Sequence, residues 1–330
     1  MVEPLLEVKD LRVHFPTDDG LVKAVDGISF SLLPGETLGV VGESGSGKSV
    51  SFLTVMGLIS RKQAQIEGEI IFQGQNLLEM SMDELRDVRG EKISMIFQDP
   101  MTSLHPYYKV GYQISEAIRV HQRVSKQEAH EQAVEMLRRV GIPRPDERAK
   151  QYPHEFSGGM RQRAMIAMAL ACRPRLLIAD EPTTALDVTI QAQILELMRE
   201  LREETGTAII LITHDLGVVA ELAQDVAVMY SGRIVEKSGV RELFARPQHP
   251  YTIGLLGSIP KLHVEQARLP AIDGQVPDPL TAPAGCRFAP RCPFATARCR
   301  EEEPPLGEVA PGQLARCWYA PLEEKAVRAA

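Results

Sequence analysis

The stretch GESGSGKS, residues 42–49, decides the fold. It fits the spacing Gly-x4-Gly-Lys-Ser, which is typical of loops that bind phosphate groups. The apolar run TLGVVG (37–42), which ends in the first glycine of the loop, predicts a buried strand, and the apolar stretch after the loop is typical of a helix. Strand, glycine-rich loop and helix in this order are the context that the pattern requires. They disfavour the alternative, a chance Gly/Ser turn.

Each residue type in this loop suits a chemical task. Gly42, Gly45 and Gly47 allow backbone N–H groups to curl around phosphate oxygens. The start of the following helix adds free N–H donors and a favourable dipole. We expect Lys48 to reach the β- and γ-phosphates and the Ser49 hydroxyl to bind Mg²⁺.

The stretch LLIADE (176–181) supplies the complementary carboxylates. An apolar strand ends in Asp180 and Glu181. Asp180 suits the magnesium shell, and Glu181 suits polarisation of the attacking water as a general base. A pair of solvated carboxylates is common at a strand end, but the phosphate loop in the same chain disfavours that alternative.

A second anion-binding helix start is predicted in FSGGMRQR (156–163). Ser157 is a favoured N-cap residue, and Gly158 and Gly159 leave backbone donors uncovered. Ser-Gly-Gly alone is usually a turn. One chain would thus carry two anion sites for one nucleotide.

Composition limits the class of protein. The chain has 330 residues, of which 44% are hydrophobic and 25% charged, with a net charge of −7. The acidic balance makes nucleic acid a poor partner. We see no signal peptide and no apolar run of the ~18 residues that a membrane helix needs, so a soluble cytosolic protein is expected.

The order of predicted elements indicates an α/β fold. Buried strands at 37–42, 175–180 and 207–213 alternate with helices, which predicts a parallel sheet covered on both faces. Residues 105–170 are expected to be mainly helical, including a helix capped by Ser125. The stretch VAVMYSGRIVEK (226–237) predicts a hairpin with Ser231 and Gly232 in its turn. Composition becomes proline-rich beyond about residue 247, so we place a domain boundary near 250–260.

Together these motifs resemble the ATP-binding-cassette ATPases over roughly residues 5–250. The matches are Gly42–Ser49 (Walker A), Gln98 (Q-loop), SGGMR at 157–161 (signature), Leu176–Glu181 (Walker B), Ala185-Leu186-Asp187 (D-loop) and His214 (switch histidine). Met160-Arg161 departs from the commonest SGGQ signature, in a form familiar among peptide importers.

The resemblance implies a P-loop domain with a RecA-like parallel sheet core, an antiparallel β region and a helical subdomain. It implies two subunits facing head to tail, with ATP between Walker A of one and the signature of the other. Gln98, Glu181 and His214 are then the catalytic candidates, and Ser49, Gln98 and Asp180 the magnesium ligands. The implied nucleotide contacts are Phe15, Gly42, Ser44, Gly45, Gly47, Lys48, Ser49, Gln98, Asp180, Ser157, Gly158 and Gly159.

Two of these assignments have structural alternatives. Phe15 matches the family's adenine-stacking aromatic, although an aromatic at a strand end is often plain core. His214 alone would be read as a buried structural histidine, but its place directly after a predicted strand favours contact with the γ-phosphate.

Two stretches narrow the family to importers. QDPMTSLHPYYKVGYQI (98–114) and RPQHPYTIGLL (246–256) resemble di- and oligopeptide importer ATPases, and nickel importers share much of the second match. The implied partners are two membrane permeases, a second related ATPase and an extracytoplasmic peptide-binding protein, with the chain peripheral at the cytoplasmic face. The competing classes are a nickel or other small-solute importer, a non-transport cassette protein and a regulatory ATPase.

Four cysteines lie close together near the end of the chain. Cys286, Cys292, Cys299 and Cys317 lack the Cys-x2-Cys pairs of common zinc sites, so zinc, an iron–sulfur cluster and unligated thiols all remain open from the spacing. Neighbouring arginines could offset thiolate charge or form a solvated surface. The resemblance implies a [4Fe–4S] cluster, with zinc as the alternative, in an extension at 256–330 that follows a nucleotide domain at 1–255.

Overall fold

The structure, a computed structural model, describes residues 3–99, 103–184, 186–258 and 272–322. The chain forms two compact units, each assembled from segments that are distant in sequence. The first comprises Met1–Leu5, Leu32–Thr37 and Glu79–Ile212, and the second comprises Leu6–Ser31, Leu38–Leu78 and Thr213–Ala330.

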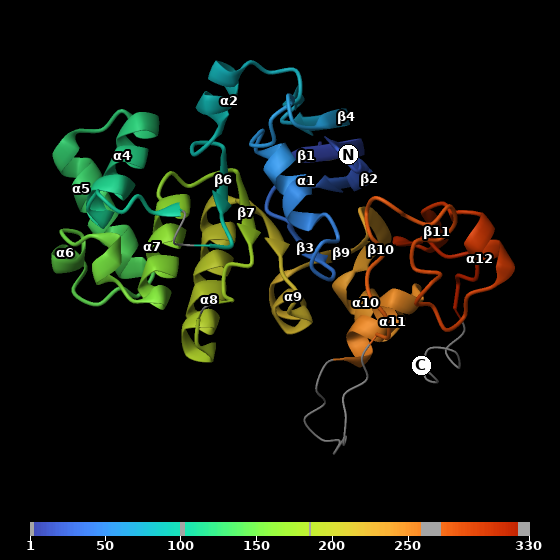
Figure 1. The fold of residues 1–330 in the computed structure, drawn as a ribbon. Coiled ribbons are helices and arrows are strands. Elements are labelled where there is room, and N and C mark those ends of the chain that lie inside the picture. The colour runs from blue at the N-terminus through green and yellow to red at the C-terminus, as the bar shows by residue number, and fades with distance from the viewer. Residues whose placement is uncertain (1–2, 100–102, 185, 259–271, 323–330) are drawn as a thin grey trace. The chain divides into compact units, whose positions relative to one another are not determined.

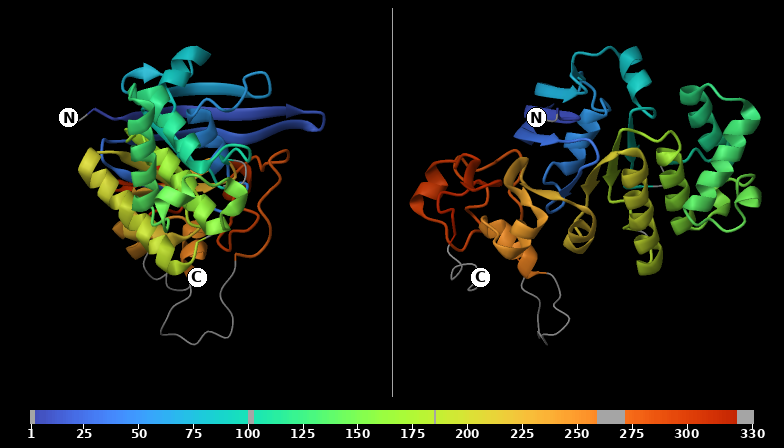
Figure 2. Two further views of the ribbon diagram at one scale, coloured as in Figure 1. Left: turned by 90° about the vertical axis from the view of Figure 1, so that its left-hand side faces the viewer. Right: turned by 180° about the vertical axis from the view of Figure 1, so that it is seen from behind.

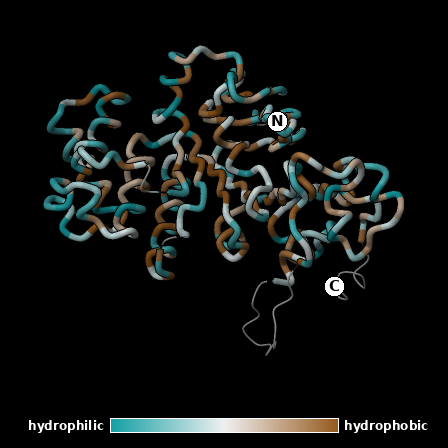
Figure 3. Tube along the Cα trace, viewed as in Figure 1, coloured by the Kyte–Doolittle hydropathy of each residue, from teal (hydrophilic) through white to brown (hydrophobic). Residues whose placement is uncertain are grey.

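The first unit contains three parallel strands in the order β8-β7-β6. They are β6 (Ile93–Ile96), β7 (Leu176–Asp180) and β8 (Ala208–Ile212), and every residue in them is buried. Hydrophobic residues accordingly concentrate along these strands (Figure 3). The continuous apolar runs predicted from the sequence are thus confirmed as strands that are covered on both faces.

Helices account for most of the rest of the first unit. Helix α5 (Lys126–Arg139) begins at the predicted cap, where the Ser125 hydroxyl accepts from the Glu128 N–H at 3.2 Å. Helices α4 to α6 gather in one cluster (Figure 1). The other helical elements are α2 (Met82–Val88), α4 (Val110–Gln122), α6 (Pro145–Arg148), the 3₁₀ turn η1 (Pro153–Glu155), α7 (Gly158–Leu170) and α8 (Val188–Thr205).

The second unit contains a four-stranded sheet in the order β2-β1-β4-β5. Its longest strands, β1 (Leu6–Thr17) and β2 (Gly20–Leu32), project as the blue ribbon of Figure 2. Strand β1 pairs antiparallel with β4 (Gln65–Phe72), and the short β5 (Gln75–Asn76) pairs with β4. This is the antiparallel β region that the resemblance implied.

The second unit also contains strands in the order β11-β12-β10-β9-β3. Strand β3 (Thr37–Val41) is parallel to β9 (Asp225–Tyr230), which forms a hairpin with β10 (Arg233–Gly239). The hairpin turns at Ser231 and Gly232, as predicted, and both have positive φ. Strands β12 (Gln313–Ala315) and β11 (Gly307–Ala310) then add to the β10 edge, which the sequence pattern did not predict.

An aromatic cluster lies at the centre of the second unit's core. Tyr230, Tyr251 and Phe288 are buried with ring centroids 4.6–5.5 Å apart. Phe288 comes from the cysteine-rich extension, so the extension shares this core. The helices of the unit are α1 (Lys48–Val55), α9 (Leu216–Leu222), α10 (Val240–Ala245), α11 (Pro250–Gly257) and α12 (Ala297–Glu301).

Among the residues that the structure describes, no helix is both long enough and apolar enough to span a bilayer.

Candidate functional site

The phosphate loop joins β3 to α1, as the sequence predicts. Gly42, Gly45 and Gly47 all have positive φ, at 151°, 78° and 97°. A Cβ on Gly42 would lie 2.1 Å from the Met229 carbonyl oxygen, and one on Gly47 would lie 2.4 Å from that of Ala24. Only glycine fits these two positions, because both the backbone conformation and the space exclude a side chain.

Lys48 lies at the centre of this loop. Its buried ammonium donates to the carbonyl oxygens of Gly42 at 2.7 Å and Glu43 at 2.9 Å. Ser49 is half-buried in the first turn of α1, whereas Ser44 and Gly45 are exposed at the loop's tip. The loop therefore holds a fixed cation among backbone groups, which is an environment suited to phosphate.

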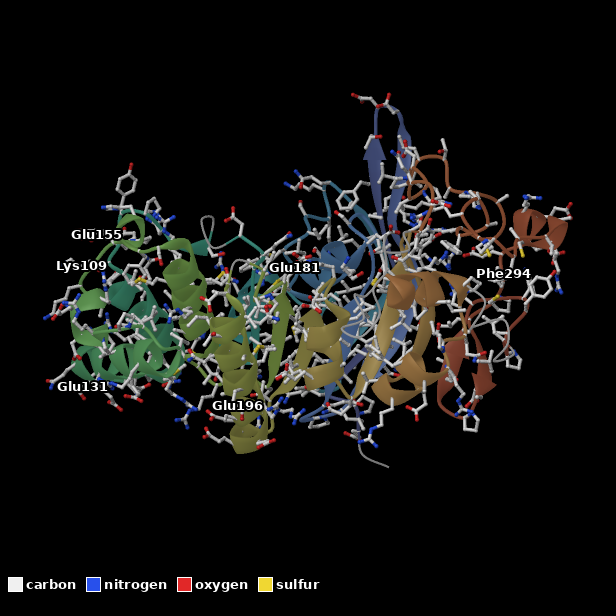
Figure 4. All side chains as sticks on the ribbon, turned by 90° about the horizontal axis from the view of Figure 1, so that it is seen from below. Lys109, Glu131, Glu155, Glu181, Glu196 and Phe294 are labelled. Atoms are coloured by element: carbon white, nitrogen blue, oxygen red, sulfur yellow. The ribbon has the colours of Figure 1, made fainter. Side chains whose placement is uncertain are left out.

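The carboxylates lie at the end of β7 in the first unit. Asp180 is 4% exposed, and Glu181 follows it with φ of 50°, a left-handed conformation that is uncommon for glutamate. Gln98 and Thr184 each donate to the same Glu181 carboxylate oxygen at 3.1 Å. Glu181 is labelled in Figure 4. The structure thus brings together Gln98 and Glu181, which the sequence selected separately.

The start of α7 is built as predicted. The Ser157 hydroxyl accepts from the Met160 N–H at 3.3 Å. A Cβ on Gly158 would meet nothing within 4 Å, and one on Gly159 would first meet a Leu186 methyl at 3.5 Å. Ser157 and Gly158 are exposed at this helix start.

The predicted D-loop is described in part. Ala185 lies outside the described residues, whereas Leu186 and Asp187 lie within them. The Asp187 carboxylate caps α8 by accepting from the Ile190 N–H at 3.0 Å. This local role accounts for an aspartate at that position.

His214 and Phe15 have different surroundings in the second unit. His214 lines a cleft of about 380 Å³ together with Gly42 and Glu43, so this histidine lies beside the phosphate loop. Phe15 is half-buried in β1, next to His14, whose ring nitrogen lies 3.2 Å from an Asp26 carboxylate oxygen.

The four C-terminal cysteines line one small apolar cavity. All four are free thiols, and the cavity between them is about 30 Å³. Its other lining residues include Phe294, which Figure 4 labels near several sulfur atoms. Among the described residues, no three or more His, Cys, Asp or Glu side chains meet the geometry of a metal-ion site. Burial, reinforced by the other thiols, raises the pKa of Cys292 to about 11.

Three of the arginines near these cysteines have side chains that are at most 14% exposed, so they do not form a solvated surface. Arg287 forms an ion pair with Asp26, and Arg291 forms one with Glu43. Arg316 donates to the carbonyl oxygens of Ile234 and Pro304, and its side chain is 14% exposed.

Arg298 is the exception among the four arginines beside the cysteines. It lies over the Trp318 ring at 3.6 Å with more than half of its side chain exposed. It pairs with Glu302, a residue of the same extension.

Several residues at these sites were not selected by sequence reasoning. Glu43 occupies an unspecified position of Gly-x4-Gly-Lys-Ser, and Thr184 lies between the Walker B and D-loop matches, so the motifs gave no reason to choose either residue. Tyr251 lies in the recognised HPYT segment, and its hydroxyl accepts from the Glu43 N–H at 2.8 Å. Contacts between residues 208 positions apart are set by tertiary packing, which a local pattern does not encode.

Comparisons with known proteins agree with this geometry. The family model for ABC transporters matches residues 25–184, and that for the C-terminal region of oligopeptide/dipeptide transporters matches residues 235–299. A probable peptide ABC transporter ATP-binding protein of Sinorhizobium fredii is 57% identical, with 95% of this chain and 94% of the relative covered. The oligopeptide transport ATP-binding protein OppD of Escherichia coli is 54% identical, with 98% and 95% covered.

A solved structure is also similar. It is a dimeric, post-hydrolysis state of the ATP-binding cassette MJ0796 bound to ADP and Pi. The TM-score is 0.66 at 26% sequence identity, with 72% of this chain and 99% of that chain covered.

Proposed function

This chain belongs to the ABC transporter family, within the ATP-binding subunits of oligopeptide and dipeptide importers, and from that premise we propose that it hydrolyses ATP to energise peptide import. One observation carries the proposal. The phosphate loop fixes Lys48 among glycines with positive φ, and the first unit holds Glu181 by two donors to one oxygen.

The proposed nucleotide contacts follow from the loop. Backbone N–H groups around Gly42, Ser44, Gly45 and Gly47 bind the phosphates, and Lys48 neutralises their charge. The hydroxyl of Ser49, the carboxylate of Asp180 and the amide oxygen of Gln98 are oxygen donors, which is the ligand chemistry that Mg²⁺ prefers. Phe15 is assigned to the adenine. Bound MgATP supplies the phosphoryl group that is transferred to water.

Glu181 is the proposed general base. Hydrogen bonds from Gln98 and Thr184 hold one carboxylate oxygen of Glu181, and this support fixes the carboxylate that would take a proton from the attacking water. The left-handed backbone of Glu181 fits a residue whose position is held for function rather than for stability. His214, beside the phosphate loop, is assigned to the γ-phosphate.

A dimer completes the proposed site. The accessible helix start at Ser157, Gly158 and Gly159 gives each subunit a second set of anion donors, which suits the γ-phosphate held by the other subunit. The similar cassette of known structure is dimeric, which supports this arrangement. ATP binding then closes the dimer, and hydrolysis reopens it.

The remaining partners are proposed from the family. Two membrane permeases, a second related ATPase and an extracytoplasmic peptide-binding protein would form the complex, with this chain peripheral at the cytoplasmic face. The relatives are named for peptide transport, which favours peptides over nickel or another small solute. We divide the chain into a nucleotide domain at 1–255 and an extension at 256–330, with the division near the end of α11.

A [4Fe–4S] cluster is the proposed ligand of the four cysteines. Such a cluster takes one thiolate at each of its four iron atoms, so its ligands surround a volume, whereas four zinc ligands meet at one ion. Cys286, Cys292, Cys299 and Cys317 line one cavity, which supports the cluster. Arg316, whose side chain is 14% exposed, supplies positive charge near Cys286. When bound, the cluster would cross-link an extension that has little secondary structure of its own.

Anaerobic purification with the neighbouring gene products tests both proposals. We expect co-purification with two permeases, ATP-dependent uptake of labelled peptide into proteoliposomes, and about four iron atoms per chain with visible absorption. ATP-dependent uptake of Ni²⁺ without peptide uptake would move the substrate assignment to nickel. Stoichiometric zinc without iron would contradict the cluster while leaving the ATPase assignment intact.

A further inference from the structure

Glu43, the second residue of the phosphate loop, is held through its backbone and its side chain. Its N–H donates to the Tyr251 hydroxyl at 2.8 Å, and its carbonyl oxygen accepts from Lys48 at 2.9 Å. That oxygen also accepts from the Ser46 N–H at 3.3 Å, which closes the turn of the loop. A displacement of Glu43 would therefore move both the turn and the lysine ammonium.

The side chain of Glu43 is held by Arg291 of the extension. The two guanidinium NH groups of Arg291 donate to the two carboxylate oxygens at 2.6 and 3.0 Å, forming a two-point ion pair. The Arg291 side chain is 3% exposed and that of Glu43 is 32% exposed. A planar guanidinium fixes both the direction and the distance of its partner, which a lysine ammonium does not.

Arg291 is itself fixed by the extension and the core. Its Nε donates to the Asp273 carbonyl oxygen at 2.9 Å, and a terminal nitrogen donates to that of Ile272 at 3.2 Å. A further contact joins it to the Tyr230 hydroxyl at 3.3 Å. The guanidinium is thus a rigid link between the loop and a segment whose next residue, Cys292, lines the cysteine cavity.

We infer that Arg291 is a positioning residue for the phosphate loop. Through Arg291, the folded conformation of residues 285–299, the cysteine segment, would affect the affinity of the loop for nucleotide. The inference rests on the proposed nucleotide site, because it assigns Arg291 a role through Glu43 and Lys48. Coupling between two sites is reciprocal, so bound nucleotide also stabilises the cysteine segment. Within the described part of the extension, Arg298 pairs with Glu302 and Arg287 pairs with Asp26, neither of which belongs to the loop.

A double-mutant cycle on the full-length chain tests the link. The measured quantity is the Kd for MgADP by titration calorimetry, in the wild type, Glu43→Gln, Arg291→Gln and the double variant. We expect each single variant to raise Kd at least about fivefold, the lower end of typical coupling between sites. The double variant should bind no more weakly than either single variant, because both remove the same ion pair.

Arg298→Gln is the matched control, since it removes an arginine of the same extension that does not contact the loop. It should leave Kd unchanged. Glu43→Gln keeps the test valid if Arg291→Gln does not fold, because its half-exposed side chain is replaced by one of the same size. The link would be overturned if Glu43→Gln had the wild-type Kd. It would also be overturned if Arg298→Gln raised Kd as much as Arg291→Gln does. Failure of the wild type to bind MgADP would instead contradict the proposed function.

Cys292→Ser tests whether the cysteine segment acts on the phosphate loop through Arg291. We expect it to raise Kd in the wild-type background and to have no further effect in Arg291→Gln, since the link is already broken there. Equal effects in both backgrounds, or no effect in either, would show that the cysteine segment does not act on the loop through Arg291.

Discussion

The phosphate loop and the cysteine segment, residues 285–299, are two irregular parts of the same unit, yet different forces shape them. The loop is shaped by its own backbone, with positive φ at three glycines and Lys48 bonded to neighbouring carbonyl oxygens. The cysteine segment is shaped by side chains whose partners are distant in sequence, such as Arg291 with Glu43, 248 positions apart.

The phosphate loop and the residues around the nucleotide form the catalytic part of the chain, and the extension with its cysteine segment forms the supporting part. Residues around the nucleotide should affect turnover more than stability, whereas residues that hold the extension should affect stability first. Changes on the two sides should therefore differ in which quantity they alter, and the following substitutions test that expectation.

The largest effect is expected at Glu181 on the catalytic side. Glu181→Gln keeps the size of the side chain and its contact with Gln98 but removes the base. ATP turnover by the assembled complex should fall by about 10²–10⁴-fold, the usual contribution of a general base. Nucleotide affinity should stay unchanged. Near wild-type turnover would contradict the assignment of Glu181.

Ser157 tests whether the catalytic part extends to the second subunit. Ser157→Arg places a large cation at an accessible helix start, so hydrolysis by the dimer should fall by about 10²-fold, comparable to the loss of a key anion donor. MgADP binding to the isolated subunit should change little. Ser157→Ala, the comparison variant, removes the helix cap and one proposed anion contact without adding a charge, so it should cost about 1 kcal/mol of stability and reduce hydrolysis less than Ser157→Arg does. Parallel losses of hydrolysis and binding in Ser157→Arg would argue against the head-to-tail dimer.

The pH dependence of folding stability tests the supporting part at Glu236. It is fully buried, and its carboxylate accepts from the N–H groups of Gln248 and His249 and from Gln313 of the extension. Burial raises its pKa to about 7 from an ordinary 4.5, so the folded state binds the proton more tightly than the unfolded state. The stability that Glu236 contributes is therefore complete below pH 4.5 and is lost as pH rises through about 7.

Comparison with Glu236→Gln isolates this contribution. The free energy of unfolding of the wild type, relative to the variant, should fall by about 3 kcal/mol between pH 4.5 and 7, since each pKa unit corresponds to about 1.4 kcal/mol. Denaturant titrations at several pH values measure it. A difference that is constant with pH, or one that rises, would contradict the raised pKa.

The smallest expected effect lies where the two parts meet. Tyr251→Phe removes the acceptor of the Glu43 N–H and should lower the free energy of unfolding by about 1 kcal/mol, the low end for an unsatisfied donor. Tyr319→Phe is the control, because its hydroxyl bonds to Thr296 at an exposed position. Equal effects in the two variants would mean that the Glu43 contact has no special importance.

The same contrast explains what the sequence could predict. The strands at 37–41, 176–180 and 208–212, the cap at Ser125 and the hairpin turn at Ser231 follow from local periodicity and turn chemistry, and all were predicted. The pairing of β12 with β10 was not, because a three-residue strand carries no period of its own.

Site prediction has the same limit. Motif spacing selected Lys48, Glu181 and His214, because phosphate and proton chemistry require those residue types at those positions. The roles of Arg291 and Thr184 depend on which side chains the fold brings within 3 Å or so, and no local pattern specifies that.

Amide hydrogen exchange of the phosphate loop, without nucleotide, tests most directly whether the cysteine segment supports the loop. If Arg291 positions Glu43, the amides of Glu43 and Ser46 should exchange faster in Arg291→Gln than in the wild type, while Arg298→Gln should match the wild type. Unchanged exchange of both amides in Arg291→Gln would contradict the account, since the loop would then hold its conformation without the extension.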